Sequence, residues 1–137
     1  MMFVLDCSVT MGWCFDDEQS EYCDEVLATL NATEAVAPVL WLCEVVNVLA
    51  VAEKRNRISE ADSMRFLHLL SSFPIWLDDE LDLGKTTGVL RLARQLGIFA
   101  YDAVYLELAV RRHCSLATCD KKLREGAKAL GVPLFLE

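Results

Sequence analysis

Short apolar runs alternate with longer segments of helical pattern along nearly the whole chain. The period of these runs predicts strands at residues 2–6, 35–37, 74–77, 115–118 and 133–136. Helices are predicted between them, at residues 20–30, 38–54, 59–70, 102–112 and 120–130, with a further helix that ends at residue 95 or 96. Strands that alternate with helices form a parallel sheet covered on both faces. The sequence therefore predicts an α/β fold of three layers, α/β/α, around a central, mainly parallel sheet.

Residues at the expected helix ends support this division. Pro38 suits the first turn of a helix, and Ser59 begins a sequence that resembles a capping box. Gly97 and Gly131 are well placed to end helices. The segment at residues 102–112 is apolar nearly all round, so we expect that helix to be buried.

The composition is that of a folded, globular protein. Apolar residues make up 54% of the 137 residues and charged residues 25%. No linker or repeat divides the chain, so we expect one domain over residues 1–137. The longest apolar run, residues 35–43, is far shorter than the ~20 residues of a membrane span, and nothing resembles a secretion signal. We therefore expect a soluble, cytoplasmic protein with no membrane partner.

The cysteines are expected to be free thiols. A cysteine within an apolar run behaves as a small buried hydrophobe, and a reducing compartment disfavours disulfides. No CxxC pair occurs, so the spacings give little support to a zinc site. The six residues concerned are Cys7, Cys14, Cys23, Cys43, Cys114 and Cys119.

Charge is distributed unevenly along the chain, whose net charge is −8. Residues 1–53 carry ten acids and no Lys or Arg, whereas residues 54–137 carry 13 bases and 11 acids. This asymmetry favours one face that attracts cations and another that tolerates phosphates. The acids at residues 78–82 match no motif and are predicted to be loop charge. Glu107 lies five residues after Asp102, about 140° around the helix, so it should face elsewhere.

Four acidic residues stand out by their positions. Asp6 ends the first predicted strand, and Asp120 follows the strand at residues 115–118. Asp102 begins a helix that is expected to be buried, and Glu44 lies among apolar neighbours within another. Such a carboxylate is costly unless it is paired or bound to a metal. Because ligands of open α/β sheets bind beyond the carboxyl ends of the strands, we expect the four acids to converge on one crevice.

Clustered carboxylates repel one another, and the sequence offers this cluster no local Lys or His partner. A hard divalent cation is the natural counter-charge, and Mg²⁺ prefers oxygen ligands. One or two such ions activate water and stabilise the charge of an in-line attack on a phosphodiester. A structural alternative is open for two of the acids, since Asp102 and Asp120 also suit the N-termini of helices as caps. That alternative explains Glu44 poorly and Asp6 hardly at all.

Four short motifs resemble, in order, those of PIN-domain nucleases, most closely the VapC-type toxins. The motifs are Asp6-Cys-Ser8, Glu44-x-x-Asn47, Tyr101-Asp-Ala-x-Tyr105-Leu and Leu116-Ala-Thr118-x-Asp120. Each motif alone is weak, but four in this order, over nearly the whole chain, are fairly specific. The resemblance implies a PIN-like fold and a divalent-metal-dependent endoribonuclease, the toxin of a type II toxin–antitoxin pair.

The resemblance also implies roles and partners. The four acids that it implies as catalytic residues and as ligands of Mg²⁺ or Mn²⁺ are Asp6, Glu44, Asp102 and Asp120. Ser8 and Thr118 are implied as polar support near the metal, and Asn47 as support beside Glu44, with a helix–helix hydrogen bond as an equal alternative. The implied partners are an RNA substrate, a cognate antitoxin that inhibits the enzyme, and a second copy of the chain in a homodimer.

Other functions fit the sequence less well. A phosphatase of the haloacid dehalogenase type also places an Asp after the first strand, but Ser8 stands where that pattern has a second Asp. A receiver-type signalling domain needs adjacent acids after the first strand and a phosphoacceptor Asp near mid-chain, and neither is evident. Within the resembled family, a housekeeping RNA-processing nuclease and a catalytically silent binding module are the alternatives; the small size favours the toxin.

Two groups of basic residues lie close in sequence to the candidate acids. Lys54, Arg55 and Arg57 follow the helix that carries Glu44, and residues 121–124 follow Asp120 with three further bases. Both groups are candidates for contacting RNA phosphates. Solvated helix ends are an equally good interpretation, because Lys and Arg are common on protein surfaces.

Overall fold

The sheet at the centre of the molecule has four strands. They are β1 (Met2–Leu5), β2 (Glu34–Pro38), β3 (Ile75–Asp78) and β4 (Ser115–Ala117). The computed structural model describes residues 2–137, and in this part of the chain the strand order is β3-β2-β1-β4, with every neighbouring pair parallel. Phe3, Val4 and Leu5 of the inner strand β1 are fully buried, as expected for a parallel sheet covered on both faces.

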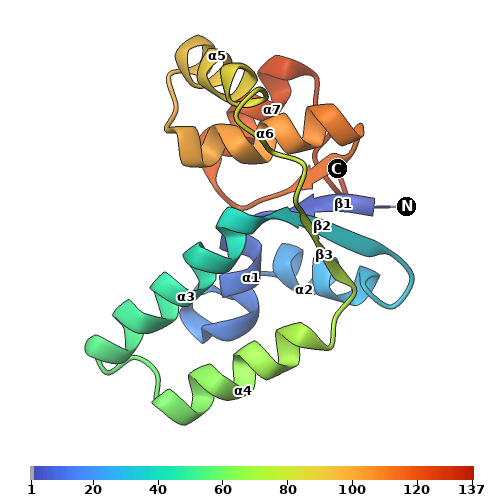
Figure 1. Cartoon of the computed structure of the whole chain (residues 1–137). Helices are drawn as coiled ribbons and strands as arrows, with labels where there is room; N and C mark the ends of the chain where they lie inside the picture. The colour runs from blue at the N-terminus through green and yellow to red at the C-terminus, as the bar shows by residue number, and fades with distance from the viewer. Residues whose placement is uncertain (1) are drawn as a thin grey trace.

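Helices cover both faces of the sheet (Figure 1). Below the sheet in that view lie α1 (Cys7–Cys14), α2 (Glu21–Thr29), α3 (Val39–Lys54) and α4 (Glu60–Ser71), with a 3₁₀ turn at Asp16–Glu18 after α1. Above it lie α5 (Thr86–Leu96), α6 (Ala100–Arg112) and α7 (Lys121–Leu130). The predicted three-layer α/β/α fold is confirmed.

Capping residues set several helix ends as predicted. The Ser59 hydroxyl accepts a hydrogen bond from the Asp62 N–H at 3.1 Å, at the start of α4. Gly97 and Gly131 end α5 and α7 in the left-handed conformation, with φ of 63° and 74°. Only glycine adopts this conformation without a steric penalty from a Cβ.

Helix α1 has no counterpart among the predicted elements. Its eight residues are mostly apolar and include the β-branched Val9 and Thr10 and the flexible Gly12, so no single helical face stands out in the sequence. The helix packs closely against α2. A Cβ added at Gly12 would lie 2.5 Å from the Sγ of Cys23, so this glycine is needed for the close approach of the two helices.

One prediction about the C-terminal half is wrong. Residues 133–136 form one isolated bridge, between Leu134 and Leu116, instead of a strand. Two backbone hydrogen bonds of 2.9 Å join this segment to β4, from the Leu116 N–H to the Pro133 carbonyl and from the Phe135 N–H to the Leu116 carbonyl. Phe135 also stacks on Phe3, with ring centroids 4.0 Å apart.

Helix α6 is buried over most of the span predicted for it, residues 102–112. Tyr105, Leu106 and Leu108 are fully buried, and within this span Val110 is the one exposed residue.

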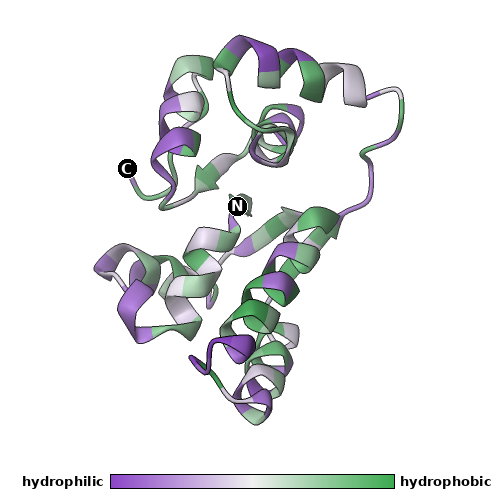
Figure 2. Cartoon of the chain, turned by 90° about the vertical axis from the view of Figure 1, so that its left-hand side faces the viewer, coloured by the Kyte–Doolittle hydropathy of each residue, from purple (hydrophilic) through white to green (hydrophobic). Residues whose placement is uncertain are grey.

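Helix α3 contributes to the core and also presents apolar side chains outward. Trp41, Val45 and Leu49 recur every fourth residue and are buried. On the other side, Leu42 is 41% and Val46 53% exposed. Figure 2 shows apolar residues concentrated in the sheet and along this helix. A helix that is apolar on both sides is suited to a contact with another protein.

Asp78 was predicted to be loop charge, and this prediction is wrong. It is the last residue of β3, is 3% exposed, and accepts hydrogen bonds from Arg111 at 2.8 Å and from Arg112 at 2.9 Å. Arg111 also pairs with Glu80 and with Glu107, so Glu107 belongs to this ion cluster. The hydrogen bond from Arg111 is the main reason that the pKa of Asp78 is below its ordinary value of 3.8. The cluster ties the end of β3 to the end of α6.

All six cysteines are free, as predicted. The Sγ atoms of Cys23 and Cys119 lie 3.4 Å apart, at a contact of α2 with the segment that follows β4. Within residues 2–137, no helix has both the length and the apolar character that crossing a membrane requires.

Candidate active site

Asp6 lies at the carboxyl end of β1, where it is only 5% exposed. Its backbone N–H donates to the Ala117 carbonyl at 3.0 Å and so continues the pairing of β1 with β4. The hydroxyls of Ser8 and Thr118 donate to Oδ2 of Asp6, at 2.5 Å and 2.8 Å. This oxygen is held in place, and the backbone N–H of Ser8 also donates a hydrogen bond to the Asp6 carboxylate. Both residues predicted as polar support thus contact Asp6.

The same two hydroxyls hold the segment that follows β4. The N–H of Cys119 donates to Ser8 Oγ at 2.9 Å, and the N–H of Asp120 donates to Thr118 Oγ1 at 3.0 Å. Asp120 is also the N-cap of α7, because its Oδ1 accepts a hydrogen bond from the backbone N–H of Leu123 at 3.0 Å. Capping therefore occupies one carboxylate oxygen of Asp120, and Oδ2 accepts no hydrogen bond within the described residues.

Glu44 lies in the second turn of α3 and is half-buried. The hydroxyl of Tyr105, in α6, donates a hydrogen bond to Oε1 of Glu44. Because α3 and α6 cover opposite faces of the sheet (Figure 1), this hydrogen bond joins the two helical layers. Oε2 of Glu44 accepts no hydrogen bond from residues 2–137.

Asp102 lies in the first turn of α6 but does not cap it. The N-cap is Phe99, and α6 has no hydrogen bond to a capping side chain. Within residues 2–137, the carboxylate of Asp102 accepts no hydrogen bond. The alternative role as a helix cap is therefore not supported for Asp102. Asp120 does cap a helix, with one of its two carboxylate oxygens.

Burial and the neighbouring acids raise the pKa of three carboxyl groups. Burial is the main cause for Asp6; hydrogen bonds from hydroxyl groups oppose the rise in pKa, and the charge of Asp120 adds to it. Burial also comes first for Glu44, whose pKa is raised further by the charges of Asp6 and Asp102. The pKa of Asp102 is raised by burial and then by the charges of Asp120 and Asp6.

Each of the four acids therefore raises the pKa of another acid or has its own pKa raised by one. This mutual effect indicates a shared acidic region beyond the ends of β1 and β4. Among residues 2–137, no three His, Cys, Asp or Glu side chains are close enough to form a ready-made metal-binding group. The expected absence of a local Lys is wrong, because the charge of Lys122 lowers the pKa of Asp102.

Two further residues qualify the sequence-based site. Asn47 is exposed on α3, and its side chain makes no hydrogen bond within residues 2–137, so neither of its two predicted roles has a contact to support it. Tyr105 is part of a recognised motif but had no predicted role. Its position in the sequence could have indicated a role in the site. Tyr105 carries a hydroxyl on an apolar helix three residues after Asp102, a spacing that places both residues on one helical face.

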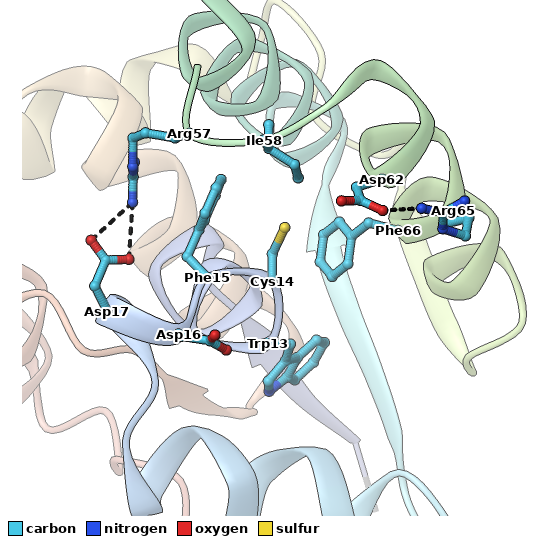
Figure 3. A pocket seen from close by; sticks show the side chains of 10 residues that line it. All are labelled: Trp13, Cys14, Phe15, Asp16, Asp17, Arg57, Ile58, Asp62, Arg65 and Phe66. Atoms are coloured by element: carbon cyan, nitrogen blue, oxygen red, sulfur yellow. Dashed lines mark hydrogen bonds and ion pairs between the residues drawn. The ribbon is translucent and has the colours of Figure 1, made fainter. Parts of the chain in front are cut away.

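A cavity of about 590 Å³ between α1 and α4 is not lined by any of the four acids (Figure 3). Aromatic side chains, including Phe15 and Phe66, line it. Arg57 is bound there by Asp17 at 3.0 Å and lies 4.3 Å from the centre of the Phe15 ring. One member of the basic group at residues 54–57 is thus already paired within the protein.

Fold and site together define an α/β domain with an acidic region at the carboxyl ends of β1 and β4. The chain belongs to the PIN domain family, whose family model matches residues 3–129. PIN domains are generally nucleases.

Solved structures share this fold at low sequence identity. The crystal structure of PAE2754 from Pyrobaculum aerophilum has a TM-score of 0.71 and 20% identity, over 92% of this chain and 84% of that one. The structure of VapBC2 from Rickettsia felis, bound to a DNA fragment from their promoter, has a TM-score of 0.67 and 14% identity, over 98% of this chain and 96% of that one. None of the curated proteins matches the chain in sequence.

Proposed function

We propose that this protein is a divalent-metal-dependent endoribonuclease and the toxin of a type II toxin–antitoxin pair. One observation carries the nuclease proposal. Three acids, Asp6, Glu44 and Asp120, each have one carboxylate oxygen fixed by a hydrogen bond, and the other oxygen of Glu44 and of Asp120 accepts none within the described residues. The fourth, Asp102, has both oxygens free and is influenced by the charges of two of the others.

The donor set suits a hard divalent cation. Its candidate ligands are carboxylate oxygens, which Mg²⁺ and Mn²⁺ accept, and their mutual repulsion is relieved by a positive charge. Asp6, Glu44, Asp102 and Asp120 would hold the metal. When bound, such an ion supplies a more acidic water and offsets the charge that develops on a phosphodiester.

The protein's own groups would position the acids and the substrate. Ser8 and Thr118 fix Asp6, so its carboxylate keeps a constant direction. Lys121 and Lys122, in the first turn of α7, are suited to contact the phosphates of an RNA strand beside the acids. Arg124 is less available, because it pairs with Glu137 and donates to the Thr118 carbonyl.

Cleavage of RNA tests the nuclease proposal. The purified protein is expected to cut RNA with Mg²⁺ or Mn²⁺, to leave 5′-phosphate ends, and to lose activity in EDTA. Asp6→Asn should abolish cleavage and keep the fold, while Asp24→Asn, a change of an exposed acid on α2, should leave cleavage unchanged. Undiminished cutting in excess EDTA refutes metal dependence. No cutting under any condition favours a silent binding module.

The toxin role rests on the motifs that resemble VapC-type toxins and on the fold shared with VapBC2 over nearly the whole chain. An antitoxin would inhibit the enzyme by placing an Arg or Lys among the acids, whose pKa values are raised by burial first and then by the charges of neighbouring acids. The exposed apolar side chains of α3 and α4, such as Val46 and Met64, suit the proposed homodimer.

Co-expression with the neighbouring reading frame tests the toxin role separately. Expression of the chain alone should stop growth, and the partner should form a complex with it and restore growth. If RNA cleavage is seen but the partner neither binds nor restores growth, the toxin role fails and a housekeeping RNA-processing nuclease is the better interpretation. Light scattering of the purified chain measures whether it is a homodimer.

A further inference from the structure

Tyr105 connects α6 to the acid on α3. Its side chain is fully buried and is among the largest buried side chains of the molecule. Its hydroxyl donates to Oε1 of Glu44, and within residues 2–137 it has no other hydrogen-bond partner. A buried hydroxyl must be hydrogen-bonded or it costs free energy. Here that requirement is met by a carboxylate of the candidate site, so the position of this carboxylate depends on the tyrosine.

Glu44 needs an external anchor more than the aspartates do. A glutamate has three rotatable side-chain bonds, and ordering such a side chain costs conformational entropy. Asp6 is fixed by two hydroxyls and Asp120 by a backbone N–H. Within the described residues, Tyr105 alone donates a hydrogen bond to the carboxylate of Glu44.

The geometry makes the tyrosine a fixed donor. Its hydroxyl donates to Oε1 of Glu44, and a hydrogen bond from a hydroxyl to a carboxylate is charge-assisted and strong. The ring is locked by packing, since the side chain has no exposed surface, so the hydroxyl occupies a fixed point.

We propose that Tyr105 is a positioning residue: it holds Oε1 of Glu44 so that Oε2 is presented to the divalent cation. This inference rests on the proposed metal-dependent function. It assigns to Tyr105 no contact with the metal or with RNA. Removing its hydroxyl should weaken metal binding by about tenfold, the lower end of the effect of removing a group that orients a metal ligand.

Tyr105→Phe tests the proposal, because it removes the hydroxyl and keeps the buried ring. Binding of Mn²⁺ to the protein without RNA is measured by electron paramagnetic resonance, which counts the free ion. The Kd for Mn²⁺ should rise about tenfold. RNA cleavage should fall at limiting Mg²⁺ and recover at saturating Mg²⁺. Tyr22→Phe is the matched control, since its half-buried hydroxyl donates to the Phe135 carbonyl at 3.0 Å; its Kd for Mn²⁺ should be unchanged.

A double-mutant cycle with Glu44→Gln separates positioning from a general loss of stability. If Tyr105 acts through the Glu44 carboxylate, Tyr105→Phe should have little further effect on the Kd for Mn²⁺ once Glu44 is Gln. An unchanged Kd in Tyr105→Phe, or the same rise in Kd with and without the Glu44 carboxylate, overturns the proposal.

Failure of the proposed function is distinguishable from failure of this inference. If the wild-type protein binds no Mn²⁺, the metal-dependent function is refuted, and the ¹³C resonance of the Glu44 carboxyl, assigned with Glu44→Gln, still tests the contact. In Tyr105→Phe this resonance should shift and show rotamer averaging, and in Tyr22→Phe it should not. An unperturbed resonance in Tyr105→Phe refutes positioning on its own.

Discussion

Thr118→Val removes the best-defined support of the acidic site and changes little else in shape. The side chain is fully buried, donates to Asp6 Oδ2 at 2.8 Å and accepts from the Asp120 N–H at 3.0 Å. Valine fills nearly the same volume, so the loss is confined to these two hydrogen bonds and to the 3.3 Å hydrogen bond between Thr118 Oγ1 and Ser8 Oγ. Thr10→Val is the matched control: Thr10 is equally buried, and both partners of its hydroxyl are neutral, since it accepts from Trp41 Nε1 at 3.0 Å and donates to the backbone carbonyl of Asp6 at 3.4 Å.

The two variants should differ in how their cost depends on pH. A hydrogen bond to a charged group contributes about 1.5–3 kcal/mol, and an orphaned amide adds about 1 kcal/mol, so Thr118→Val should cost about 2–4 kcal/mol when Asp6 is ionised. The bond from Thr118 lowers the pKa of Asp6 against the dominant effect of burial, so its loss raises the folded-state pKa further. The cost is therefore largest at high pH and shrinks as the pH falls through the raised pKa of Asp6, which lies above the ordinary value of 3.8. The cost of Thr10→Val should not follow this titration.

Urea unfolding of both variants and the wild type, in EDTA over a series of pH values from 8 down to about the ordinary pKa of 3.8, measures these differences. A loss of about 2–4 kcal/mol corresponds to a drop in Tm on the order of 10 °C for a domain of this size. A cost of Thr118→Val that stays constant over the whole series would refute the idea that its hydroxyl supports an ionised Asp6. A parallel pH dependence in Thr10→Val would show that the trend belongs to the whole fold.

Three further predictions concern the acids and the bases around them. Without metal, the raised pKa of Asp102 makes the free energy of unfolding fall as pH rises from the ordinary 3.8 through the raised value. In EDTA, thermal melting should show Asp102→Asn to be as stable as the wild type or more so, and millimolar Mg²⁺ should stabilise the variant less than the wild type. Strong destabilisation of Asp102→Asn in EDTA would contradict this. Asp78→Ala should cost about 1.5–3 kcal/mol in urea unfolding, because it removes charge-assisted hydrogen bonds to a buried carboxylate, while Arg111 keeps Glu107 and Glu80 as partners. Since the pKa of Asp78 is lowered, its contribution is present above pH 3.8 and is lost as pH falls, and a cost below 1 kcal/mol would refute this role. Replacing Lys121 and Lys122 by Gln should weaken RNA binding and lower the slope of log K against log salt by about one per lysine. Lys128→Gln, at the far end of α7, is the control. An unchanged slope in the Lys121 and Lys122 variants would favour the interpretation that these bases are solvated helix ends.

The layers and the positions of the four acids within them were predictable because their signals are local. The alternation of apolar runs and helical periods determines the order of strands and helices, and a parallel sheet brings the ends of β1 and β4 to one edge. Asp6 and Asp120 follow those two strands directly. Asp102 follows from the start of an apolar helix. In each case, one stretch of sequence contains both the element and the acid.

Features that depend on contacts between distant segments were not predictable. Helix α1 has no clear polar face, and its place is set by the fit of Gly12 against Cys23 in the next helix. Asp78 looked like part of a charged loop, because its partners Arg111 and Arg112 come more than thirty residues later. The link between Tyr105 and Glu44 joins two helices on opposite faces of the sheet. Periodicity contains no information about such pairs.

The four acids differ in how firmly the protein holds their carboxylates before a cation binds, so variants of the site should differ in their response to added metal. Asp6, Glu44 and Asp120 each have one oxygen already fixed by the protein, whereas Asp102 has neither oxygen fixed within the described residues. A bound cation would therefore have to order Asp102 itself, and it would meet a ready oxygen from each of the others. Removing an anchoring hydroxyl, at Ser8 or Tyr105, leaves the charge in place and adds only the cost of ordering, which a higher metal concentration can offset. Removing a carboxylate takes away a ligand and a charge together, so a higher metal concentration should restore RNA cleavage far less in such a variant.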